Sequence, residues 1–476
     1  MPFDAASFAQ ILLDYRGALE WLTVAVAIVI FVSSADDFFI DAYYWIRRAR
    51  RRLFVRPKSP PLPLEKLAEK PEQPLAIMVP AWKESDVIAA MLWTNAELIR
   101  YRNYHFFVGT YQNDPATAAE VAKVAAHNPN VHCVTVPRDG PTCKADCLNT
   151  IIAGIHDYER ANGVEFAGIA MHDAEDIIHP LELRFFNYLI DRKDLIQLPI
   201  FSLRCPPSAI VAGTYMDEFA EWHSKDLVVR ESMTGTVPCA GVAACFSRRA
   251  MRALSDETGG APFNTSTLTE DYDIAFRLKK LGMKEVFVRF PVKEAVDTKR
   301  GGGLQVVDRQ GPIATKEYFP SAFVAAYRQR ARWILGIAFH GWKAIGWRAS
   351  WPGRYFLLRD RKTIVTSPAN MVAMFLALHF LLVEAALAFF PSAPRVATIF
   401  ETSPTMQLLL LVNLGFLLLR LFHRVFFTAH IYGSLHGLLA IPLLGVAKAV
   451  FVTAQPAGAT KGRRRWWRRP TAPGSR

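Results

Sequence analysis

Residues 166–176 read FAGIAMHDAED, a short apolar run that ends in a cluster of acids. Residues 166–171 have the length and composition of a buried strand, and Asp173, Glu175 and Asp176 follow directly. Three acids within four residues repel one another unless a cation neutralises them. Mg²⁺ or Mn²⁺ prefers oxygen ligands and keeps coordination positions open for phosphate oxygens. We therefore expect Asp173 and Glu175 to hold a divalent cation and a diphosphate. The alternatives are a solvated loop, and, for Asp176, a cap on the helix entered near Pro180.

The sequence upstream of this strand alternates between apolar runs and segments with helical spacing. Strands are expected at 75–79, 105–111 and 131–136, and helices at 85–100, 116–126 and 143–156. This alternation predicts an α/β domain with a doubly wound, mostly parallel sheet. Ligands of such sheets bind beyond the carboxyl ends of the strands, where Glu84 and Asp114 also fall.

Three uncharged apolar stretches approach the length of about 20 residues that a helix needs to cross a bilayer. They are residues 21–35, 363–383 and 402–419. Asp36, Asp37 and Asp41 follow the first and are expected at the membrane edge or paired with arginine. A cleaved signal peptide is not expected, because the residues before the first stretch are acidic rather than basic.

These features divide the 476 residues into eight segments. We expect a transmembrane helix with a basic juxtamembrane stretch (1–56), a Pro-rich linker (57–74), a cytoplasmic domain (75–325), amphipathic interfacial helices (326–362), two transmembrane helices (363–391 and 402–428), interfacial or re-entrant helices broken at Pro442 (431–455) and a basic tail (456–476).

The composition limits the classes of function. Hydrophobic residues make up 51% of the chain and charged residues 21%, which excludes a disordered protein. The net charge of +13 gathers in basic stretches beside the apolar segments, so it indicates contact with membrane lipids rather than with nucleic acid. The same stretches place the N-terminus outside and the polar middle in the cytoplasm. The six cysteines lack zinc-type spacing and are expected to be reduced thiols.

Six motifs together resemble those of the membrane-embedded family 2 glycosyltransferases. In chain order they are IMVPAWKES (77–85), YQNDPAT (111–117), KADCLN (144–149), HDAED (172–176), TED (269–271) and QRARW (329–333). The residues around HDAED and QRARW are most similar to the NfrB (phage adsorption protein B) group of this family. The resemblance implies a GT-A-like domain that transfers a sugar from a UDP-sugar donor to a glycan or a lipid-linked acceptor, with inversion and with Mg²⁺ or Mn²⁺.

The resemblance also implies residue roles. Glu84 and Asp114 match the donor-binding acids at the nucleoside, Lys144 matches a lysine near the phosphates, and Asp173 and Glu175 match the DxD metal site. Glu175 is one methylene longer than the usual Asp. Asp271 matches the catalytic base of the family, and Glu270 is the second acid of the catalytic pair. The alternative is that both acids only begin a helix whose N-cap is Thr269. Gln329, Arg332 and Trp333 match the motif for acceptor and diphosphate, and Gly241 lies near the acceptor.

At the level of the cell, the resemblance implies a multi-pass protein of the bacterial inner membrane that makes a surface glycan used as a phage receptor. An outer-membrane export partner and a homo-oligomer fit the small number of spanning helices. The competing hypothesis is a non-catalytic membrane scaffold or phage-adsorption component that retains the fold.

Overall fold

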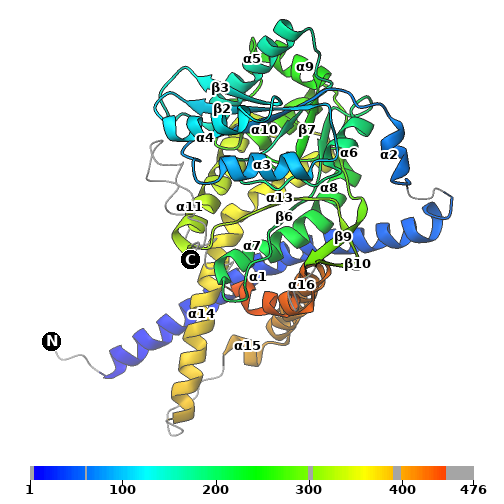
Figure 1. Ribbon diagram of the computed structural model, residues 1–476. Helices are drawn as coiled ribbons and strands as arrows, with labels where there is room; N and C mark the ends of the chain where they lie inside the picture. The colour runs from blue at the N-terminus through cyan, green and yellow to red at the C-terminus, as the bar shows by residue number, and fades with distance from the viewer. Residues whose placement is uncertain (1–4, 59–61, 298–303, 390–397, 446–476) are drawn as a thin grey trace.

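The computed structural model describes residues 5–58, 62–297, 304–389 and 398–445, with backbone alone for 5–13, 293–297 and 304–310 (Figure 1). A long helix, α1 (Ala5–Arg50), ends in a short turn, η1 (Arg51–Val55), and leads into an α/β domain. The first half of this domain contains α2 (Glu65–Glu69), β1 (Leu75–Pro80), α3 (Ile88–Leu98), β2 (Tyr104–Tyr111), α4 (Pro115–Ala125), β3 (Val131–Val136), α5 (Lys144–Asn162) and β4 (Gly168–Met171).

The second half departs from simple strand and helix alternation. It contains α6 (Glu182–Leu189), β5 (Leu195–Gln197), β6 (Ile200–Ser202), α7 (Ile210–Glu221), η2 (Trp222–Asp226), α8 (Leu227–Thr234), β7 (Ala244–Ser247), α9 (Arg248–Thr258), α10 (Glu270–Lys280), β8 (Glu285–Phe287), β9 (Pro291–Asp297), β10 (Leu304–Pro312) and β11 (Thr315–Glu317).

The central sheet has the strand order β3-β2-β1-β4-β7-β5-β8. Strands β3, β2, β1 and β4 pair in parallel, whereas β7 is antiparallel to both of its neighbours. All six residues of β1 are buried, as expected for a strand with both faces covered. The predicted α/β class with a mostly parallel sheet is therefore confirmed.

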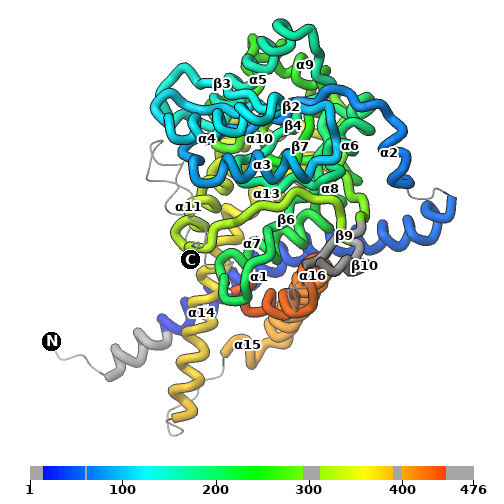
Figure 2. Tube along the Cα trace, in the orientation of Figure 1, coloured from blue at the N-terminus to red at the C-terminus, as the bar shows by residue number. Residues whose placement is uncertain are grey.

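Alternate residues of β1 enter two separate cores. Leu75, Ile77 and Val79 pack with residues of α3, α4 and α6 on one face. Ala76 and Met78 pack with residues of α5, α9 and α10 on the other. Because β1 pairs in parallel with β2 and β4, the carboxyl ends of these strands lie at one shared edge of the sheet. Figure 2 shows the trace of the chain, with helices packed around the strands.

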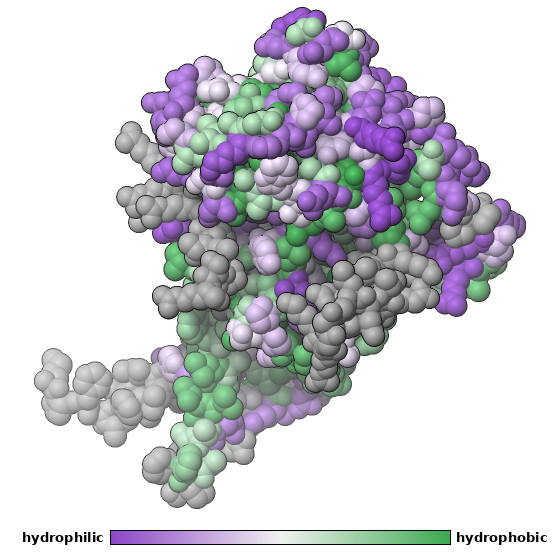
Figure 3. Space-filling model, viewed as in Figure 1, coloured by the Kyte–Doolittle hydropathy of each residue, from purple (hydrophilic) through white to green (hydrophobic). Residues whose placement is uncertain are grey.

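The chain then returns toward α1 through a series of helices. These are α11 (Phe323–Ile334), η3 (Leu335–His340), α12 (Gly341–Ile345), α13 (Trp351–Arg361), α14 (Thr363–Phe389), α15 (Ile399–Thr402) and α16 (Pro404–Tyr432). Among the described residues, three helical stretches are long and apolar enough to cross a membrane: Asp14–Val55, Trp351–Phe389 and Pro404–Tyr432. The first two contain the predicted apolar stretches 21–35 and 363–383, and the third begins two residues inside the predicted stretch 402–419. In Figure 3 the lower part of α14 is hydrophobic, whereas the face of the α/β domain above it is mixed and largely hydrophilic.

Two local expectations can be compared with the structure. The predicted break at Pro442 is wrong: a helix runs through it from Ser434 to Gly445, and the chain breaks instead at Gly433, where φ is 97°. The expected Pro-rich linker contains the short helix α2, which inserts Leu67 into the core. The basic tail lies outside the described residues.

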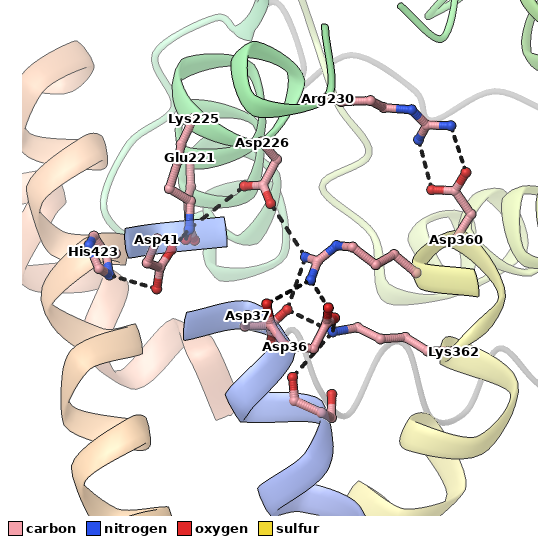
Figure 4. A network of polar contacts seen from close by, with 12 residues as sticks. Asp36, Asp37, Asp41, Glu221, Lys225, Asp226, Arg230, Asp360, Lys362 and His423 are labelled. Carbon is pink, nitrogen blue, oxygen red and sulfur yellow. Dashed lines mark hydrogen bonds and ion pairs between the residues drawn. The ribbon is translucent and has the colours of Figure 1, made fainter. Parts of the chain in front are cut away.

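The carboxylates after the first apolar stretch are paired, Asp36 and Asp37 with arginine as expected and Asp41 with other cationic residues. Asp36 and Asp37 contact Arg359 and Lys362, and Asp37 also contacts Arg420 at 3.1 Å. Asp41 contacts Lys225 and His423 (Figure 4). Buried charges of this kind are costly unless they are paired, so the network fixes how α1, α13 and α16 meet the α/β domain.

Candidate active site

Two predicted donor-binding acids lie together where β1 and β2 end. Lys83 adopts a left-handed backbone with φ of 59°, and its amide donates to the Asp114 carboxylate. The Glu84 amide donates to Thr117 Oγ1 at 2.9 Å, and the Asp114 side chain caps α4 by accepting from the Thr117 amide. Both carboxyl-bearing residues are almost fully buried. The two strand ends thus form one acidic corner through Thr117.

A second group of predicted residues converges around Gly241. Lys144 Nζ lies 2.7 Å from Asp173 Oδ1 and donates to the Gly241 carbonyl at 3.2 Å. A Cβ on Gly241 would lie only 2.7 Å from Asp271 Oδ2, and φ of Gly241 is 81°. Glycine is therefore required here by both backbone conformation and space. The structure brings Lys144, Asp173, Gly241 and Asp271 together from four separate parts of the chain.

Burial raises the pKa of both acids at the start of α10. Burial and the neighbouring Asp271 carboxylate raise the pKa of Glu270 to about 7. Burial also raises the pKa of Asp271, and the charges of Lys144 and Arg332 oppose that shift. The expected N-cap, Thr269, occupies the cap position, but its hydroxyl makes no capping bond. An acid with a raised pKa beside fixed cations is suited to accept a proton near neutral pH.

Asp176 does not take the capping role expected from the sequence. It is fully buried, accepts from the Asp173 amide at 3.1 Å and lies 2.9 Å from His172 Nδ1. His172 Nε2 lies 3.0 Å from Glu182, and although burial lowers the pKa of His172, Glu182 and Asp176 together raise it to about 10. The expected cap on α6 is wrong, because its N-cap position is Leu181 and carries no side-chain cap. Asp176 and His172 instead hold the loop that carries Asp173 and Glu175.

Glu317 is an acid of this site that the motifs did not indicate. An antiparallel bridge between Ile177 and Lys316 brings the end of β11 beside the acidic loop. Burial and the charges of Asp176, Glu175 and Asp173 raise the pKa of Glu317 well above its ordinary value. A lone glutamate in a three-residue strand carries no sequence signal, so only the tertiary structure reveals it.

The oxygen atoms of these acids suit a hard divalent cation whose remaining coordination positions are filled by substrate phosphates and water. Asp173 and Glu175 offer carboxylate oxygens, and Glu317 lies at the end of the strand that bridges to this loop. Within the described ranges, no group of three or more His, Cys, Asp or Glu side chains is arranged to hold a metal ion alone. Mg²⁺ sites of this kind use one or two carboxylates together with substrate phosphates and water.

The QRARW residues lie on α11, and they differ in how they are placed relative to the acids of the site. Arg332 is close enough to Glu270 and Asp271 to lower the pKa of each. Gln329 Oε1 is buried and has no hydrogen-bond partner among the described residues. Trp333 packs 6.1 Å, between ring centroids, from both Tyr215 and Phe219, so much of its ring contacts protein.

Arg330, between the predicted members of this motif, was not singled out from the sequence. It is completely buried, lies 2.7 Å from Glu218 and stacks 4.4 Å from the Tyr215 ring. It therefore joins α11 to α7, which packs in turn on α16 through the contact between Asp217 and Arg424 at 3.0 Å.

Comparison with known proteins places this arrangement in a family. Residues 168–417 match the family described as "Glycosyl transferase family group 2". The chain belongs to this family.

Similar proteins include two curated relatives and a solved structure. Bacteriophage adsorption protein B of Escherichia coli K12 and bacteriophage N4 adsorption protein B of E. coli O157:H7 are each 46% identical over 424 residues. Each match covers 89% of this chain, but the chain spans only 57% of the length of these relatives. A mannosyltransferase from Pyrobaculum calidifontis, solved with GDP-Man and Mn²⁺, matches with a TM-score of 0.49 and 18% identity over 83% of this chain and 98% of its own.

Proposed function

We propose that the protein is a metal-dependent, inverting glycosyltransferase that uses a UDP-sugar. The observation that carries the proposal is the convergence of Lys144, Asp173 and Asp271 around Gly241 in a member of a glycosyltransferase family. These groups come from the helix after β3, the loop after β4 and the first turn of α10. The fold thus brings one cation and two carboxylates close together, which supports these roles for them.

The donor would lie along the edge of the sheet. The acidic corner of Glu84 and Asp114 would receive the nucleoside, and Lys144 and Arg332 would hold the diphosphate by charge. Asp173 and Glu175 would hold Mg²⁺ or Mn²⁺, which acts as a Lewis acid toward the leaving diphosphate when bound. Fixed positive charge at this position stabilises the negative charge that builds on UDP.

Transfer would occur by a single displacement at the sugar C1. The acceptor hydroxyl oxygen forms a bond to C1 while the bond from C1 to the diphosphate oxygen breaks, and the electron pair leaves with UDP. Asp271 takes the hydroxyl proton as the new bond forms, with Glu270 as the second acid of the pair. Attack from the face opposite the leaving group inverts the anomeric centre. Gln329, Arg332 and Trp333 would border the acceptor path.

We place the protein in the bacterial inner membrane with the α/β domain in the cytoplasm. The three membrane-type helices and the basic residues at their ends support this placement. The acceptor would be a growing polysaccharide or a lipid-linked sugar, and the product a surface glycan. The names of the curated relatives support a link between that glycan and phage adsorption. Export would involve an outer-membrane partner or a homo-oligomer.

The same relatives support a second candidate, a phage-adsorption scaffold without turnover. The two candidates differ in one measurement. Purified protein in lipid nanodiscs should release UDP from at least one UDP-sugar of a hexose or N-acetylhexosamine panel in the presence of Mg²⁺ or Mn²⁺, and mass spectrometry should find the sugar on an acceptor. Excess EDTA should abolish release. Turnover that persists in EDTA refutes the metal role, and an inert protein with every donor and lipid extract supports the scaffold.

A further inference from the structure

The residue that follows the candidate base is connected to Asp271 and to a membrane-type helix at the same time. The Tyr272 amide donates to Asp271 Oδ1 at 2.7 Å. Its phenol hydroxyl donates to the carboxylate of Asp360 on α13. Tyr272 is only 6% exposed. One residue therefore joins the candidate base to the helical stretch Trp351–Phe389, which is one of the three that could span a membrane.

Asp360 is itself held rigidly. Arg230 on α8 donates to both of its carboxylate oxygens, each at 2.9 Å, in the paired arrangement visible in Figure 4. The Arg230 guanidinium is buried and lies 5.3 Å from the ring of Phe356. Two parallel hydrogen bonds to a guanidinium fix both the position and the plane of a carboxylate. The Asp360 carboxylate, which accepts the hydrogen bond from the Tyr272 hydroxyl, is thus held in one position.

The neighbours of Asp360 on α13 are held by α1. Arg359 contacts Asp37 at 3.0 Å and also Asp36, and Lys362 contacts each of the two at 2.7 Å (Figure 4). Four charged groups, two on α1 and two beside Asp360, therefore help to set where Asp360 lies. A displacement of α13 relative to α1 would break contacts between charges that are largely removed from water.

The Tyr272 ring cannot easily compensate for such a displacement. A Cβ on Gly341 would lie 3.3 Å from Tyr272 Cε1, and a Cβ on Gly336 would lie 2.3 Å from Thr269 Cγ2. The first turn of α10 is thus pressed against η3 and α12, which continue directly from the QRARW helix. Close packing transmits small movements because interiors have few voids.

We propose that Tyr272 and Asp360 are positioning residues that orient Asp271 and make glycosyl transfer depend on the seating of the membrane helices. This inference rests on the proposed function, because it concerns the base of that reaction. Neither residue touches the reacting atoms. We call the chain of hydrogen bonds from Asp360 through Tyr272 to Asp271 the tie. It acts on Asp271 through the backbone amide of Tyr272.

The variant Tyr272→Phe tests the tie, because it removes one hydroxyl and leaves the ring and the pair of Arg230 with Asp360. We expect kcat to fall about 10- to 100-fold, since misplacement of a catalytic group by a fraction of an ångström has effects of this size. KM for the UDP-sugar should stay within about twofold, because the donor-binding groups are elsewhere. The matched control is Tyr43→Phe, which removes a hydroxyl bonded to Ser232 of α8 at 3.1 Å instead of one bonded to Asp360; its kcat should equal that of the wild type.

Two further readouts separate this inference from a loss of folded protein and from failure of the proposed function. Titration with UDP and Mn²⁺ should give as many binding sites per chain as in the wild type, and fewer sites would overturn the positioning role. Hydrogen exchange of peptides within 268–276 should be faster in Tyr272→Phe than in the wild type or Tyr43→Phe. Unchanged exchange, or an unchanged kcat, overturns the tie. If the wild type turns over no donor, the proposed function fails, while the exchange measurement still decides whether the tie exists.

Discussion

Asp271→Asn should lower the turnover of the UDP-sugar by about 10²–10⁴, the usual contribution of a general base. The substitution keeps the size of the side chain but removes its ability to take the acceptor proton. UDP binding should persist, because Lys144, Asp173 and Arg332 remain. Initial rates of UDP release and a UDP titration on the same preparation measure the two quantities.

Asp273→Asn is the matched control for this variant. Asp273 lies on the same helical turn, but its carboxylate faces Arg277 at 3.8 Å rather than Gly241. Its kcat should stay close to that of the wild type. Near-normal turnover in Asp271→Asn would remove Asp271 from the mechanism, and equal losses in both variants would indicate damage to α10 instead.

Gly241→Ala should have the second large effect, a loss of at least about 10² in kcat. The new Cβ would lie 2.7 Å from Asp271 Oδ2, so the base must move, and displacement of a catalytic group by about 1 Å has effects of this size. The Gly241 carbonyl, which accepts from Lys144, would be disturbed as well. Steady-state kinetics of the purified variant test this expectation.

Gly259→Ala separates steric displacement from backbone strain. Gly259 also has a positive φ, 69°, but a Cβ there would meet nothing within 4 Å. Both variants incur a backbone cost of about 1 kcal/mol in stability. Only Gly241→Ala should lose activity beyond that. Equal activities for the two variants would show that the approach of Asp271 to Gly241 is not important for turnover.

The first half of the α/β domain could be predicted because its strands and helices are local. The expected strand at 131–136 coincides with β3, and the one at 75–79 differs from β1 by a single residue. The antiparallel pairing of β7 with β4 and β5 carries no local signal, since its neighbours lie far from it in sequence. The helix ends at Gly433 rather than at Pro442, because glycine readily adopts a positive φ whereas the proline is accommodated within the next helix.

The candidate site was predictable where a motif ends a strand or opens a helix. Lys144, Asp173, Gly241 and Asp271 lie together for that reason. Asp176 was misjudged because its partner is the buried ring of His172, which itself depends on Glu182 from the next helix. Glu317 and Asp360 reach the site or its surroundings through tertiary packing alone, so no pattern along the chain marks them.

The central claim is that the acidic loop after β4 binds a nucleoside diphosphate through a divalent cation. Titration of UDP into the protein in lipid nanodiscs tests it most directly. We expect saturable binding with Mn²⁺ that weakens at least about tenfold in EDTA, and equally in Asp173→Asn with Mn²⁺, because one or two carboxylates link such a cation to the protein. Binding of the same affinity in all three conditions, or no binding in any of them, would rule out a metal-dependent diphosphate site at this loop.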